Sequence, residues 1–149
     1  MTLSPSRPDD PEFFALLTGS FRRLVGRVLT DRDAAWLYDE APFVVLSHDT
    51  QSDPVFIYAN KAAQDRFGYD WAEFLTLPSR LSAEAPLREE RQRLLDTVRA
   101  KGFIDDYAGI RIAKSGRRFR IKDAIVWQLI GPDGTVHGQA ATFADWEDV

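Results

Sequence analysis

The sequence predicts an α+β fold in which five antiparallel strands form one sheet, with helices on one face and an amphipathic helix before the first strand. Three observations predict this. Residues 12–29 carry apolar side chains at helical spacing, two short apolar runs follow at 43–46 and 55–58, and three strand-like segments come after residue 102. Helical segments between the second and third strands indicate that helices gather on one side of the sheet.

The amino-terminal segment divides into a tail and a helical extension. Residues 1–11 are rich in Ser, Pro and Asp and predict a flexible tail. The helix over residues 12–29 has an apolar stripe made by Phe13, Leu17, Phe21, Leu24 and Val28. Thr30 and Asp31 are expected to end it, and a second, short helix follows through Tyr38. We therefore predict a tail (1–11), an extension (12–40) and a main domain (41–149).

The main domain opens with two predicted strands at residues 42–47 and 54–59, and the short link between them suggests an antiparallel hairpin. Asn60 is a good N-cap and Gly68 a good stop for the next helix. Asp70 and Glu73 have the spacing of a capping box for another short helix. A longer helix is predicted over residues 86–101, ended by Gly102. Its buried face is expected to hold Leu87, Leu94, Leu95 and Val98.

The last third of the chain predicts strands. Residues 103–113 form the first of them, and 114–117 form a turn. The second has apolar residues at alternating positions, and its members are Phe119, Ile121, Ile125, Trp127 and Leu129. The Gly-Pro-Asp-Gly segment at 131–134 is a strong turn signal, and the last strand covers residues 135–146.

Composition excludes several classes of protein. The chain has 149 residues, a net charge of −4 and no cysteine. A disulfide or a thiolate metal site within the chain is therefore excluded, and the acidic balance argues against nucleic-acid binding. No apolar run is long enough to cross a membrane. These features lead us to expect a cytoplasmic protein that binds neither nucleic acid nor membranes.

Residues 57–69, Ile-Tyr-Ala-Asn-Lys-Ala-Ala-Gln-Asp-Arg-Phe-Gly-Tyr, resemble the signature of PAS domains. A closer match is the MEKHLA domain, a PAS-related family of bacteria and of the carboxyl end of certain plant homeodomain–leucine zipper regulators. The stretches that look like this family are 107–112, 116–119 and 138–141, together with Phe143 and Trp146. The resemblance spans residues 13–146. It implies a PAS-like fold and a role in sensing, ligand binding or protein association, and it supplies no catalytic residues.

The same resemblance bears on cofactors. Some PAS relatives hold flavin through a reactive cysteine, which the lack of cysteine excludes here. Others bind haem through a histidine on the long helix before the last strands, but residues 86–101 contain none. The two histidines, His48 in a predicted turn and His137 on the last strand, are expected to be surface or hydrogen-bonded residues. Haem is therefore not expected, and the identity of any other cofactor stays open.

A ligand cavity is expected between the sheet and the helices of residues 61–101. Asp123 shares the strand parity of the apolar residues around it, so its carboxylate should be paired or protonated. Arg111 on the neighbouring strand is a candidate partner in a structural ion pair. A strand-edge position and contact with a ligand are the alternatives for Asp123. The candidate lining residues are Tyr58, Phe67, Tyr107, Arg111, Ile121, Asp123 and Trp127.

Two main functional hypotheses follow, and a third is weaker. The first is a sensory module that binds a small molecule in this cavity. The second is a ligand-free interaction domain that forms a homodimer through residues 12–29. The third is a small enzyme on an α+β fold. The sequence shows no catalytic triad, phosphate loop or nucleophile elbow, so we expect a protein that is not an enzyme and has no metal site.

Overall fold

The structure, a computed structural model, describes residues 3–149 except for the side chains of residues 85–87, so the expected burial of Leu87 lies outside the described residues. The helices are α1 (Pro11–Val25), α2 (Ala34–Asp39), α3 (Lys61–Phe67), α4 (Trp71–Phe74) and α5 (Ala85–Lys101), with a 3-10 turn, η1 (Ser79–Ser82). The strands are β1 (Val44–His48), β2 (Phe56–Ala59), β3 (Phe103–Ile112), β4 (Arg118–Ile130), β5 (Val136–Phe143) and β6 (Asp145–Asp148). This order confirms the predicted fold class.

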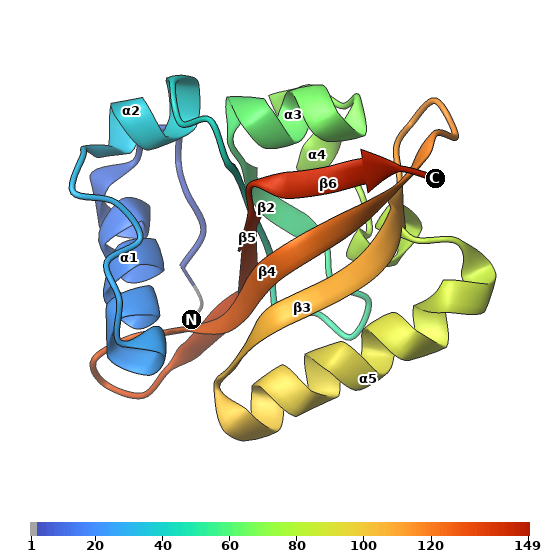
Figure 1. The fold of residues 1–149 in the computed structure, drawn as a ribbon. Helices are drawn as coiled ribbons and strands as arrows, with labels where there is room; N and C mark the ends of the chain where they lie inside the picture. The colour runs from blue at the N-terminus through green and yellow to red at the C-terminus, as the bar shows by residue number, and fades with distance from the viewer. Residues whose placement is uncertain (1–2) are drawn as a thin grey trace.

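All strand pairs are antiparallel, and the sheet has the order β2-β1-β5-β4-β3. The predicted last strand is divided in two. Strand β5 pairs with the carboxyl half of β4, and β6 continues along the same edge to pair with its amino half. The pairing is interrupted opposite Asp123, so β6 is a sixth strand, and in Figure 1 it turns away from the end of β5.

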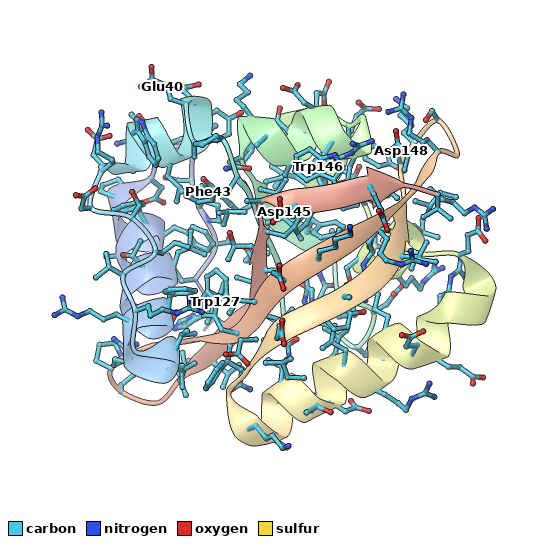
Figure 2. The ribbon with its side chains drawn as sticks, in the orientation of Figure 1. Glu40, Phe43, Trp127, Asp145, Trp146 and Asp148 are labelled. Atoms are coloured by element: carbon cyan, nitrogen blue, oxygen red, sulfur yellow. The ribbon has the colours of Figure 1, made fainter. Side chains whose placement is uncertain are left out.

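Helices cover both faces of the sheet. Helix α1 lies at the left of Figure 1 and α5 at the lower right, with the strands between them. Helix α1 packs its apolar stripe on Trp127 and Leu129 of β4, whereas α5 places Leu94 and Val98 against Val126. The ring of Phe21 meets that of Trp127 edge to face at 4.8 Å, and Trp127 points toward α1 (Figure 2). The amino-terminal extension therefore shares a core with the main domain.

Helix α1 ends earlier than the sequence predicts. Gly26 adopts a left-handed conformation with φ of 80°, and its N–H donates to the carbonyl of Arg22. A glycine in this conformation closes a helix because it carries no Cβ to clash. Val28, expected in the helical stripe, is left exposed beyond this end.

The tail also contacts the body of the domain. The backbone N–H of Leu3 donates to Nδ1 of His137 on β5, at 2.6 Å. Asp10 then caps α1 by accepting from the N–H groups of Glu12 and Phe13. No helix in residues 3–149 is long and apolar enough to span a membrane.

Two bulges in the long β3–β4 hairpin decide which side chains share a face. The register shifts once on β3 near Asp106 and once on β4 near Asp123, and these two residues have positive φ angles of 57° and 50°. An extra residue in a strand reverses the alternation beyond it. Phe119 and Ile121 therefore pack on the α3 side, whereas Trp127 packs on the α1 side.

This corrects the expectation that Asp123 lies on one continuous apolar face. Asp123 is exposed at the bulge, and its carboxyl is beside that of Asp106 rather than near Arg111. A hydrogen bond with Asp106 and the repulsion between the two carboxylates raise the pKa of Asp123 above its ordinary value. Arg111 donates instead to the hydroxyl of Tyr107 and to the carbonyl of Ile110.

Replacing Asp123 with asparagine is expected to raise the melting temperature at pH 7, because it removes this repulsion. A raised folded-state pKa means that, as the pH falls, the wild-type carboxyl takes up its proton earlier in the folded than in the unfolded chain. The advantage of the Asp123→Asn variant should therefore shrink as the pH falls through the folded-state pKa. Thermal melts of both proteins from pH 7 to pH 3 check this, and an advantage that is constant across the range would contradict it.

Asn60 connects three elements at the start of α3. Its Oδ1 accepts from the N–H of Ala63, as the N-cap prediction requires, and also from the N–H of Val45 on β1. Its Nδ2 donates to the carbonyls of Leu37 and Phe43. The side chain is fully buried. Asn60 therefore holds α2, β1 and α3 together with four hydrogen bonds.

Candidate functional site

A cavity of about 50 Å³ lies between the sheet and α5. Its walls come from β1 to β5, from α3 and α5 and from η1. Its polar lining residues are His48, Ser82, Arg91, Tyr107, Arg111 and Gln139. Its apolar lining residues are Leu46, Phe56, Phe67, Leu94, Leu95, Ile121, Val126, Ala140, Ala141 and Phe143. The lining contains two arginines and no acidic residue, so it carries a net positive charge.

Four of the seven candidate residues meet at this cavity, namely Phe67, Tyr107, Arg111 and Ile121. Tyr58 and Trp127 instead pack in the core under α1. Burial raises the pKa of the Tyr58 hydroxyl above its ordinary value, so the phenol stays neutral. Asp123 lies outside at the bulge. The bulge near Asp123 explains why Trp127 lies away from the cavity, because it turns Trp127 to the opposite face of the sheet from Ile121.

Arg91 is a site residue that the sequence reasoning missed. It lies on α5, its side chain is 9% exposed, and the structure shows no hydrogen bond from its guanidinium to any described residue. A signal for it existed, because Arg91 precedes Leu94 by three residues and Val98 by seven, which places it on the buried stripe of the helix. Burial and the neighbouring charge of Arg111 lower the pKa of Arg91 to about 10, so it is charged at neutral pH.

Arg111 is held in place by its own strand. Its Nη2 donates to the hydroxyl of Tyr107, four residues earlier, at 3.1 Å. Gly109 lies between them on the same side of β3. A Cβ at Gly109 would lie 2.4 Å from the Tyr107 hydroxyl oxygen and 3.2 Å from Arg111 Nη1. The glycine therefore leaves the space in which the tyrosine and the arginine meet.

His48 and Gln139 form a second polar part of the lining. They are register partners on β1 and β5. Nδ1 of His48 lies 2.9 Å from the carbonyl of Asp49, which requires the proton on Nδ1 and leaves Nε2 as an acceptor. Nε2 of His48 and Oε1 of Gln139 are both buried without a partner among the described residues. His48, expected in a turn as a surface or hydrogen-bonded residue, is hydrogen-bonded and lies buried at the end of β1.

The buried His48 predicts a loss of stability in mild acid. Burial, with a smaller contribution from the charge of Arg91, lowers its pKa from 6.5 to about 4. Between these values the unfolded chain binds a proton that the folded chain does not, so folding stability falls as the pH drops from 6.5 to 4. The expected loss is on the order of 3 kcal/mol.

Urea unfolding of wild type and of His48→Gln at pH 7, 5.5 and 4 measures this effect. The difference in the free energy of unfolding between the two proteins should change across this pH range. His48 is the cause, since all other titrating groups are common to both proteins. Parallel curves for the two proteins would contradict the prediction.

Comparisons with known proteins agree with this architecture. The sequence profile of the MEKHLA domain matches residues 11–148. A search of curated proteins gives no significant match. A PAS domain from Colwellia psychrerythraea superposes with a TM-score of 0.61 at 16% identity, covering 77% of this chain and 92% of that one.

Two further solved structures are similar. A fungal LOV domain photoreceptor has a TM-score of 0.59 at 18% identity, and the match covers 89% of this chain and 91% of the photoreceptor chain. The photo-excited blue-light photoreceptor Vivid has a TM-score of 0.57 at 16% identity, and the match covers 85% of this chain and 92% of the Vivid chain. At such identities the likeness shows the fold alone.

Proposed function

This chain belongs to the MEKHLA domain family and has the PAS fold, and from that premise we propose that it is a sensory module that binds a small molecule between its sheet and α5. The observation that carries the proposal is the cavity itself. Two buried polar atoms in its lining, Nε2 of His48 and Oε1 of Gln139, lack partners among the described residues. Buried polar groups without partners are costly, so a ligand that supplies partners would stabilise the folded state.

The likeness to PAS and LOV structures gives this proposal its second support. One similar structure, with a TM-score of 0.57 at 16% identity, is of a light-oxygen-voltage domain studied with a flavin analogue. We propose a different ligand class here, because the cavity of about 50 Å³ is too small for a flavin and the chain lacks cysteine. We also propose binding rather than catalysis, and a reducing, cytoplasmic setting in keeping with the lack of cysteine.

A cavity-filling variant tests the binding function. Ala141 lines the cavity, and Ala141→Leu should fill it. We expect native mass spectrometry or thermal shift with a library of small acids, amides and nucleobases to identify a compound that stabilises wild type and not Ala141→Leu. A ligand at a hundred times its Kd should add about 2.7 kcal/mol. Ala144→Leu is the matched control, because Ala144 is exposed in the bend between β5 and β6 and does not line the cavity.

Two results would overturn the proposed function. One is a library in which no compound shifts the melting temperature and no molecule co-purifies with the protein. The other is a stabilising compound that acts equally on wild type and Ala141→Leu.

A second proposal is self-association through residues 12–29, and one observation limits which part of this segment is available for contact. The apolar stripe of α1 is buried on the sheet, but Val28 is 62% exposed beside a surface groove lined also by Phe43 and Ile125. A dimer through this segment should therefore use Val28. Light scattering at increasing concentration should show association in wild type and weaker association in Val28→Glu, whereas a monomeric wild type would remove the proposal.

A further inference from the structure

The two arginines of the cavity have no acidic partner among the described residues. Arg91 reaches the cavity from α5 and Arg111 from β3, and each is 9% exposed. Within residues 3–149, the ion pairs of the structure involve other basic side chains, all with acidic partners at the surface. A buried charge without a counter-charge is costly, because burial removes its hydration. Two like charges at one cavity add their mutual repulsion to that cost.

The hydrogen-bonding groups around the arginines favour an acceptor. Arg91 has its guanidinium donors free of the described residues, and Arg111 uses part of its own for Tyr107 and the carbonyl of Ile110. Because Arg111 donates to the Tyr107 oxygen, the tyrosine keeps its own hydrogen to donate elsewhere. Three side chains thus offer donors at one place, and two of them are positively charged. A carboxylate satisfies this set, since guanidinium groups bind it with paired hydrogen bonds.

The rest of the lining limits what the carboxylate is attached to. Apolar side chains from both walls, including Leu94, Ile121, Val126 and Phe143, surround the arginines. This surface suits a short hydrocarbon chain rather than a second charged group. The volume of about 50 Å³ limits the ligand to a few non-hydrogen atoms. His48 is neutral at neutral pH, and its unpartnered Nε2 accepts hydrogen bonds, as Oε1 of Gln139 does. The anionic end of the ligand therefore belongs at the arginines and not beside these two acceptors.

Resting on the proposed function, we propose that this cavity recognises a short-chain organic carboxylate, with its anionic end held by Arg91, Arg111 and the Tyr107 hydroxyl and its alkyl chain against the apolar wall. Arg91 and Arg111 are the groups that select for negative charge. Gly109 acts indirectly, because it leaves the space in which Tyr107 positions Arg111.

Calorimetry with an isosteric pair tests the charge selection. Sodium butyrate and butyramide have the same size, and only the first is an anion. Wild-type protein is expected to bind butyrate and to bind butyramide at least about 10-fold more weakly, since a charge-assisted hydrogen bond contributes about 1.5–3 kcal/mol. Sodium phosphate and sodium chloride at equal sodium concentration test whether the cavity is a site for inorganic anions. If either salt binds as tightly as butyrate, the proposal is overturned.

Variants assign the binding to these residues. Arg91→Met and Arg111→Met should each weaken butyrate binding by about 10- to 100-fold. Arg99→Met is the matched control on the same helix, because the Arg99 side chain is 70% exposed, and it should bind as wild type does. Without ligand, Arg91→Met should melt at a higher temperature than wild type. Should an arginine variant fail to fold, Tyr107→Phe keeps the test available, with an expected loss of about three- to tenfold in affinity.

The outcomes separate this inference from the proposed function. Neutral compounds that bind in wild type and not in Ala141→Leu, with no binding of carboxylates from formate to butyrate, would overturn the carboxylate and leave the sensory cavity standing. Butyrate binding that is unchanged in Arg91→Met and Arg111→Met would overturn the assigned residues. A protein that binds nothing in its cavity would remove both proposals.

Discussion

Replacing Asn60 with alanine is expected to lower the free energy of unfolding by about 3–5 kcal/mol. The change removes four hydrogen bonds from a fully buried position and leaves the carbonyls of Leu37 and Phe43 without their donor. Each unsatisfied buried group costs about 1–3 kcal/mol. Urea denaturation followed by tryptophan fluorescence measures the loss.

Asp70→Ala is the matched control for Asn60→Ala. Asp70 also caps a helix, α4, through a reciprocal pair of hydrogen bonds with Glu73, but this pair is exposed. Its loss should cost about 1 kcal/mol. Equal losses in the two variants would show that Asn60 acts as a helix cap alone and does not connect the three elements.

Replacing Gly138 with alanine is expected to destabilise the protein by at least about 3 kcal/mol, or to prevent folding. A Cβ at this position would lie 2.0 Å from the carbonyl oxygen of His48, which belongs to the backbone of the neighbouring strand. The φ angle of 154° is also one that residues with side chains rarely adopt. Relief would require β1 and β5 to separate at the point where His48 meets the cavity.

Gly134→Ala separates the contribution of backbone conformation from that of the clash. Gly134 has a φ of 86°, but a Cβ there would meet no atom within 4 Å. Its replacement should cost about 1–2 kcal/mol, from conformation alone. Circular dichroism melts of the two variants make the comparison, and a Gly138→Ala protein as stable as Gly134→Ala would contradict the predicted clash.

Local signals predicted most of the fold. Asn60 and Gly68 were assigned as the ends of α3 because cap residues act on their own helix, and both roles are confirmed. The order of the strands along the chain was predicted from turn signals and from the alternation of apolar residues. The sequence did not predict that Gly138 admits the backbone of β1, the strand with which β5 pairs. Such a close approach depends on strand pairing and is not visible within the segment itself.

The site was harder to predict than the fold, for two physical reasons. Strand parity was extended through Asp123, but a bulge there reverses it, so Trp127 faces α1 and not the cavity. In addition, Arg91 was not named as a candidate, because arginine is usually exposed. Its position on the buried stripe of α5 outweighs that general tendency. Arg111 was named as a partner for Asp123, and it instead faces Arg91 and Tyr107.

Because of the paired bulges, neither strand of this hairpin can gain or lose a residue without a change in the fold. Each strand carries one extra residue, near Asp106 and near Asp123, and the two insertions compensate so that both ends of the hairpin keep the same register. Deleting a single residue at Asp123 would turn one half of β4 over. Either Phe119 and Ile121 would be presented to solvent, or Trp127 would be withdrawn from α1. A deletion of one residue is therefore more disruptive here than most substitutions at the same place.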